Sequence, residues 1–216
     1  MALTWDPAHK AALIALSGGN LIATSSAGSG TVNAAVYGTV AISATVKQYF
    51  EVTITGTTGQ YCSVGMINGS ASLTANIGTT NGSGLVNKLA GGGTTTVALR
   101  NGSQTVAAFR NFATGNVIRV AIDRAANRMW WAINAFTWST SNIWYGSGSV
   151  PVDPAAGTNG LDISPTTGTI YPAFSSAWTG DVATINGGAT AFAFGPPAGF
   201  VGIDAAAVRR RVMVVG

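Results

Sequence analysis

The strongest constraint on how this chain folds is the period-two alternation of apolar and polar residues between positions 116 and 134. Alternate residues in the segment 118–123 are aliphatic, and after a turn-forming run at 124–127 the alternation resumes over 129–133. Alternation with this period predicts a β-strand with one face against a core. Two such runs across a short turn predict an antiparallel hairpin with one apolar face.

Comparable short patterns recur along the chain and predict roughly a dozen strands separated by turn residues. The alternation in 46–55 predicts a central strand, with 61–68 as its hairpin neighbour. Asn101-Gly102 predicts a hairpin that joins 94–99 to 104–109. Further strands are predicted at 11–16, 21–24, 31–37, 171–175, 182–186 and 191–194.

Two segments allow a different interpretation. Residues 7–16 could instead form a helix, because proline is accepted in a first helical turn and alanines follow it. Glycine, threonine and asparagine dominate 69–93, which predicts long loops around one or two short strands. Loops of that length in a compact domain are typically functional or covered by a partner.

The alternating faces of many short strands are buried most economically between two packed antiparallel sheets. We therefore expect an all-β protein with a two-sheet antiparallel β-sandwich. With no recognisable linker, residues 1–204 are predicted to form one domain. Residues 205–216 are predicted to be a short C-terminal extension that contacts a neighbouring subunit.

The surface of this protein is poor in charge. Charged residues make up 8% of the 216 residues, whereas glycine alone contributes 29. A surface that is polar mainly through hydroxyl and amide groups suggests that much of it is hidden in an assembly. Three of the 11 basic residues lie at 209–211, and the remaining ones nearly balance the 7 acidic residues. The body of the domain is thus predicted not to bind nucleic acid.

The reactive residues do not form an obvious catalytic constellation. Cys62 is the only cysteine and His9 the only histidine, which excludes an internal disulfide and argues against a cysteine zinc site or a serine triad. The acidic residues are spread without paired spacing, and Glu51 is interpreted as a structural carboxylate. We expect no enzymatic activity and no cofactor, although a calcium site built from backbone carbonyls remains open.

The chain begins without the basic and apolar blocks of a secretory signal, and it contains no run of 18 apolar residues. We therefore expect a protein that is made in the cytoplasm and does not insert into a membrane.

Five pieces of the sequence, in order, resemble a SPRY domain, a concanavalin-like β-sandwich of jelly-roll type that is used for binding. They are VKQYFEVTIT (46–55), YCSVGMIN (61–68), NVIRVAIDRAANRMWWAIN (116–134), YPAFSS (171–176) and ATINGGATAFAFGPPAGF (183–200). The chain departs from that family at Asn116, where the family has aspartate, and in the loops of 69–93. Because specificity in the family lies in loops, the resemblance implies the fold and not the ligand.

The small, glycine-, alanine- and threonine-rich chain with a C-terminal extension is also similar to SPRY-like proteins that tailed bacteriophages and prophages encode. That similarity implies a virion component and hence a virion location. We expect a non-enzymatic structural protein, a head decoration, fibre or tail component, whose partners are copies of itself and other virion proteins. A host cell-surface glycan is a further expected ligand. The alternative is a stand-alone carbohydrate- or peptide-binding module whose site is formed by the loops 69–93 and 135–160.

Two groups of residues are candidates for binding. Four aromatic residues would stack on a sugar ring or anchor a protein partner if exposed: Trp130, Trp138, Trp144 and Tyr145. The competing interpretation is that the loop 135–145 folds back and covers Trp130. A second group lies in the C-terminal extension, where an apolar run follows three arginines and favours docking on a neighbour by strand addition: Arg209, Arg210, Arg211, Val212 and Val214.

Overall fold

The computed structural model describes residues 2–28, 33–57, 61–79, 81–90, 93–100, 103–109, 113–134, 144–146 and 152–204. The described chain is built from strands and loops, apart from two helical residues at 203–204. No helix in these ranges is long and apolar enough to span a membrane. The strands are β1 (Trp5–Lys10), β2 (Ile14–Ser17), β3 (Ile22–Ser26), β4 (Ala34–Gly38), β5 (Gln48–Gly56), β6 (Ser63–Asn68), β7 (Gly82–Ala90), β8 (Gly93–Arg100), β9 (Ser103–Phe109), β10 (Val117–Asp123), β11 (Arg128–Ile133), β12 (Leu161–Asp162), β13 (Ile170–Ser176), β14 (Thr179–Asn186) and β15 (Val201–Gly202).

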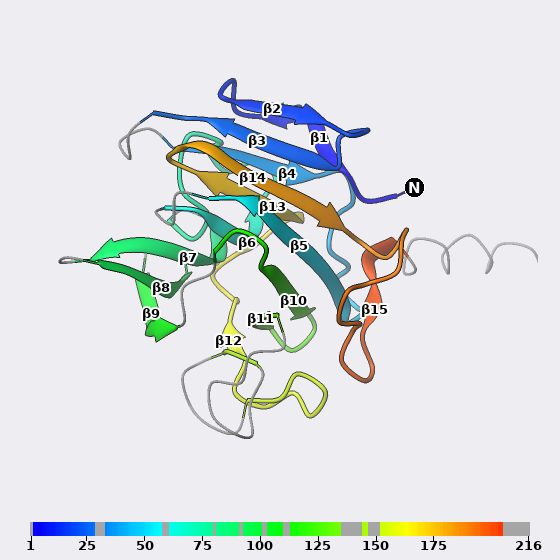
Figure 1. Ribbon diagram of the computed structural model, residues 1–216. Coiled ribbons are helices and arrows are strands. Elements are labelled where there is room, and N and C mark those ends of the chain that lie inside the picture. The colour runs from blue at the N-terminus through cyan, green and yellow to red at the C-terminus, as the bar shows by residue number, and fades with distance from the viewer. Residues whose placement is uncertain are drawn as a thin grey trace, which may run out of the picture.

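The strands form the two layers of a β-sandwich, as the sequence predicted (Figure 1). The first sheet has the order β1-β4-β13-β6-β7-β8-β9, and the second has the order β12-β11-β10-β5-β14-β3-β2. Within the described strands, neighbours in these two orders pair antiparallel, and β15 pairs parallel with β5. Many of the loops between consecutive strands cross from one sheet to the other, and these loops join the two layers of the sandwich.

The hairpin predicted at 116–134 is present as β10 and β11. Ile118 lies opposite Ile133 and Asp123 opposite Arg128, with a four-residue turn between the strands. Asn127 in that turn has a φ of 52°, a left-handed conformation that asparagine accepts more readily than most residues. The prediction of a single buried face was wrong, because every residue of β10 is buried. Residues from two loop segments, including Val152 and Phe200, cover the outer face of the sheet over β10 and β11.

The core between the sheets contains the residues that the alternation assigned to the inner face. It joins Phe50 and Val52 of β5 to Val64 and Phe174 of the opposite sheet. Trp5 of the first sheet reaches across, because its Nε1 donates to the carbonyl of Ala183 in the second sheet at 3.2 Å. The buried apolar residues therefore hold the layers together over their full width.

The prediction that 61–68 pairs with the preceding strand was wrong. β5 is central in the second sheet, between β10 and β14, as expected. β6 lies in the first sheet between β13 and β7, so the chain changes layer between the two strands. Phe50 and Val64 face the same core from opposite sides, an arrangement that strands in one sheet cannot achieve.

Three further predictions are corrected. The segment 7–16 is not a helix: it is divided between β1 and β2, and Lys10 Nζ donates to the Ile14 carbonyl across the bend at 2.8 Å. The region 69–93 contains the nine-residue strand β7, which is longer than its glycine content suggested. Residues 191–194 are not a strand, since the backbone amides of Ala193 and Phe194 donate to a side chain.

Candidate functional site

The outer face of the second sheet carries an aromatic cluster, here called the outer cluster. Its buried members come from the sheet and from two covering segments, and Trp144 and Phe192 pack against it at the periphery. The covering segments are 152–161, which includes Val152, and 187–204, which includes Phe200. The buried members are Tyr49, Ala121, Trp130, Val152 and Phe200.

Trp130 is fully buried in the outer cluster, with 0% of its surface exposed. Its ring meets Phe200 edge to face at a centroid distance of 6.1 Å, and its Nε1 donates to the Thr158 carbonyl at 2.9 Å. A Cβ on Gly160 would lie 2.6 Å from the indole, so the covering segment approaches as closely as glycine permits. The ring of Trp130 is therefore structural and does not present a face to a ligand.

The other aromatic candidates have different surroundings. Tyr145 is 3% exposed, and its backbone exchanges two hydrogen bonds with Trp131 at 2.6 and 3.0 Å. Trp138 lies outside the described residues. Trp144 is half-buried and leaves part of its ring at the surface.

A buried polar chain lies beneath Trp144. Glu51 is directly opposite Arg119 in the β5–β10 ladder. Tyr49 Oη donates to Glu51 Oε1 at 2.6 Å, and Arg119 Nε donates to Tyr49 Oη at 3.4 Å. The amides of Ala193 and Phe194 donate to the same carboxylate at 2.8 and 3.0 Å. This confirms that Glu51 is a structural carboxylate, and it explains why residues 191–194 stay next to the sheet without forming a strand.

Burial and the hydrogen bond to Glu51 both raise the pKa of Tyr49 well above its ordinary value. The phenol is therefore neutral and remains a donor at any physiological pH. The arrangement fixes the Glu51 carboxylate and leaves it no role as a general base.

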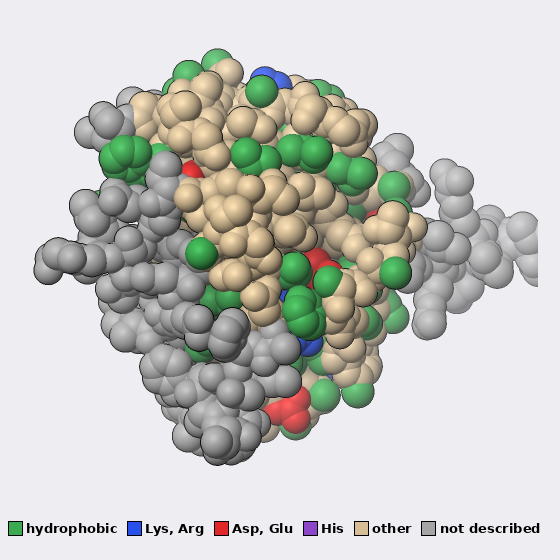
Figure 2. Space-filling model, viewed as in Figure 1, with side chains coloured by type: hydrophobic (Ala, Val, Ile, Leu, Met, Phe, Trp, Pro, Cys, Tyr) green, Lys and Arg blue, Asp and Glu red, His purple; other side chains and the backbone are tan. Residues whose placement is uncertain are grey.

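Arg119 stands between two aromatic rings at the surface end of this chain. Its guanidinium carbon lies 4.6 Å from the centroid of Trp144 and 5.2 Å from that of Phe194. Phe194 is 39% exposed. The described part of the face over β5 and β14 is otherwise nearly free of charged side chains (Figure 2). Sequence reasoning missed Arg119 as a site residue, because its position opposite Glu51 depends on the pairing of two strands far apart in the chain.

A second candidate site, also missed, lies at one end of the sandwich. Trp178 occupies the two-residue turn between β13 and β14 and is half-buried. Its backbone amide donates to Ser176 Oγ at 2.9 Å, and that hydroxyl donates to the buried Asp181 at 2.6 Å. The buried Asp181 thus fixes the turn that carries Trp178 through the hydroxyl of Ser176. The signal available in the sequence was a tryptophan between strand residues and Thr179-Gly180.

Three buried polar atoms of the described residues lack hydrogen-bond partners at this same end: Asn33 Oδ1, Ser63 Oγ and Trp178 Nε1. The pairing places them together, since Ser63 is opposite Ser175 and Asn33 directly precedes the partner of Ser176. Trp178 is half-buried at this end, and its accessible part makes it a second candidate contact residue.

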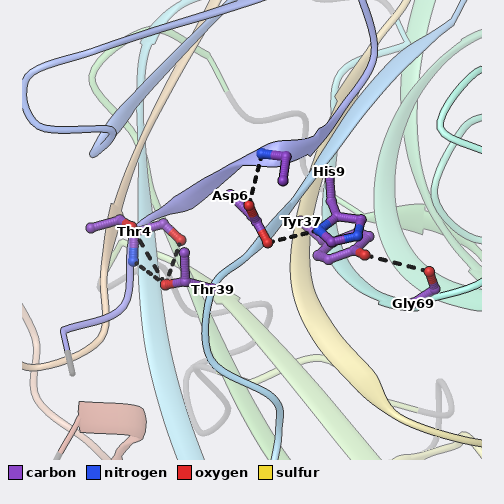
Figure 3. Close-up of polar contacts among 7 residues, drawn as sticks. Thr4, Asp6, His9, Tyr37, Thr39 and Gly69 are labelled. Atoms are coloured by element: carbon purple, nitrogen blue, oxygen red, sulfur yellow. Dashed lines mark hydrogen bonds and ion pairs between the residues drawn. The ribbon is translucent and has the colours of Figure 1, made fainter.

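His9 lies on β1, close to Asp6 and Tyr37 (Figure 3). Its Nδ1 is 2.8 Å from Asp6 Oδ2, and its ring stacks on Tyr37 at a centroid distance of 4.8 Å. Tyr37 stacks in turn on Tyr171 at 4.7 Å. This row of rings fixes β1 on the sheet, and His9 has no serine partner among its contacts here.

The described residues contain no group of three or more histidine, cysteine, aspartate or glutamate side chains that could hold a metal ion. Three of the described aspartates make hydrogen bonds to nearby backbone amides. Asp204 accepts from the Leu3 amide at 2.6 Å, Asp123 caps the hairpin turn at Ala126 at 3.0 Å, and Asp162 contacts Ser164 at 2.9 Å.

The fold is similar to several solved SPRY domains. The SPRY domain of human HERC1 matches 87% of this chain and 99% of its own length, with a TM-score of 0.62 and 14% sequence identity. The TRIM65 PSpry domain matches 86% of this chain and 92% of its own, with a TM-score of 0.56 and 14% identity. A human SPRY domain matches 83% and 98%, with a TM-score of 0.54 and 13% identity. No protein-family model and no curated protein sequence matches the chain.

The fold is a SPRY-like β-sandwich. At this level of identity the likeness establishes the architecture alone. The predicted all-β class and the predicted resemblance to that fold are therefore confirmed. The C-terminal candidates at 209–214 and most of the loop 135–151 lie outside the described part of the SPRY-like sandwich, so their roles stay predictions.

Proposed function

We propose that this chain is a non-enzymatic interaction module that acts by protein–protein contact as a structural component of a phage-like virion. The observation that carries the proposal is the stack of Trp144, Arg119 and Phe194. Tryptophan and arginine are the side chains most enriched at binding hot spots. Arg119 itself is buried, and it holds the partly exposed rings of Trp144 and Phe194 in place, so a partner that packs on these rings loses little side-chain entropy.

Two further observations support a role based on contact. SPRY domains generally serve as protein-interaction modules, and the buried carboxylate of Glu51 accepts hydrogen bonds from Tyr49, Ala193 and Phe194. The virion part of the proposal rests on composition. With only 8% charged residues, the chain has few of the charges that keep a freely diffusing protein soluble, which favours a surface covered by neighbours.

The test is hydroxyl-radical footprinting of particles isolated from the native source, compared with the isolated chain. We expect the chain in the particles, with Trp144 and Phe194 oxidised several-fold more slowly there than in the isolated protein. Trp130 serves as the internal control, because it is buried in the fold and should be oxidised slowly in both samples. Absence of the chain from the particles, or equal oxidation of Trp144 and Phe194 in both samples, would contradict the proposal.

A further inference from the structure

Each sheet of a sandwich has two edge strands whose outer backbone amides and carbonyls have no partner within the sheet. In the described sheets these edges are β1 and β9 in the first and β12 and β2 in the second. Natural proteins protect such edges with charge, proline, irregular pairing or short length, because an open edge is a template for another strand.

Three of these edges carry such protection. β1 contains Asp6, Pro7 and Lys10, and its register against β4 shifts along the strand. β12 has two residues and β2 has four. Both edges are shorter than a five-residue segment that would add to them.

β9 is different. It has seven residues, SQTVAAF, with neither a charged residue nor a proline. It pairs with β8 on one side, through a ladder with two register shifts, and is the last strand in the order of its sheet. Its length and composition make it the edge best suited to accept a strand.

The C-terminal extension of the same chain contains a short apolar run that could pair with such an edge. Residues 212–215 are Val-Met-Val-Val, which favours an extended strand. They follow Asp204, which is tied to the body through the Leu3 amide and the Gly187 carbonyl at 2.6 and 3.1 Å. In Figure 1, β15, which ends two residues before Asp204, and β9 lie on opposite sides of the sandwich. A segment that leaves from this side reaches the β9 of an adjacent copy more directly than its own.

We propose that residues 211–215 of one copy add as a strand to the open edge of β9 in a neighbouring copy. The inference rests on the proposed assembly function and names the contact that builds the assembly. Backbone hydrogen bonds supply the affinity in this mode of binding. Because the two contacting surfaces differ, the contact is head to tail and generates a closed ring or a filament.

Disulfide trapping between full-length chains tests the proposal. One chain carries Val214→Cys, and the other carries Val106→Cys or Ala107→Cys, at two consecutive positions of β9. On mixing under oxidised glutathione, we expect a mixed disulfide between Val214→Cys and at least one of the β9 variants. Ala8→Cys on the exposed β1 edge is the matched control and should cross-link several-fold less. Cys62 is buried and does not interfere.

A double variant gives the independent readout. Val212→Pro with Val214→Pro removes two backbone donors from the segment without touching the sandwich, and it should abolish oligomers in sedimentation velocity. Replacing both valines with alanine is the control and should retain most of the oligomer. Preferential cross-linking between two copies of β9 would overturn the proposal, as would oligomers that persist in the proline variant. Either result would contradict the β9 contact without contradicting the proposed function. A native chain that is strictly monomeric and absent from particles would contradict both the β9 contact and the proposed function.

Discussion

At the scale of single residues, Glu51 is the polar group on which most of the outer face depends. It accepts hydrogen bonds from Tyr49, Ala193 and Phe194 and lies opposite the buried Arg119. Glu51→Ala leaves these donors unpaired, so we expect it to lower the free energy of unfolding by about 3 kcal/mol. Glu51→Gln keeps one acceptor oxygen and should cost less. Chemical denaturation measures both, and a loss below about 0.5 kcal/mol for alanine would contradict this role.

Cys62 predicts how stability depends on pH. Burial, and secondarily the charge of Asp181, raises the pKa of the thiol well above its ordinary value in the folded protein. The unfolded thiol ionises near pH 8.5, so the folded state loses relative stability as pH rises above that value, by about 1.4 kcal/mol per unit. Cys62→Ala should remove this slope between about pH 8.5 and 10. An unchanged slope in denaturation experiments would show that the thiol is not the titrating group.

The residue scale also shows where sequence reasoning succeeded. The inward positions of β5 and β10 could be predicted, because a period of two separates the faces of a strand whatever its partners are. The sequence could not predict whether an outward-pointing residue is exposed, because its exposure depends on loops that are distant in the chain. Trp130 and Arg119 both point outward from the second sheet, yet one is sealed by residues 152–161 and the other stacks between surface rings.

At the scale of elements, the covering segment 152–161 must approach β11 very closely. A Cβ at Gly160 would lie 2.6 Å from the indole of Trp130 and 2.9 Å from Cβ of Arg128. We expect Gly160→Ala to displace the segment and to cost about 1–3 kcal/mol in chemical denaturation. Gly28→Ala is the matched control, because no atom lies within 4 Å of the Cβ built there. Equal stability of the two variants would mean that the segment adapts without strain.

Elements could be located from sequence more readily than they could be paired. The hairpins β8–β9 and β10–β11 were predicted correctly, because the partners are joined by short turns with characteristic residues. The pairing partner of β6 was not predicted correctly, although the sequence just before β6 resembles a hairpin turn. Its inner residues belong to the opposite side of the same core, and alternation carries no information about the layer to which a strand belongs.

At the scale of the whole molecule, two layers hold one continuous core, and the features suited to contact lie on its outside. These are the stack around Arg119, the end that carries Trp178 and the edge strand β9. They lie in different parts of the fold, so one copy has separate surfaces with which to touch more than one neighbour. Separate surfaces of this kind would allow the head-to-tail contacts that we propose.

Electron microscopy of particles from the native source tests this central claim most directly. We predict a symmetric particle in which two-layered sandwiches of this chain repeat at fixed positions, with the stack around Arg119 buried against a neighbouring protein. Particles that lack the chain, or a map in which that face of every copy is open to solvent, would contradict it.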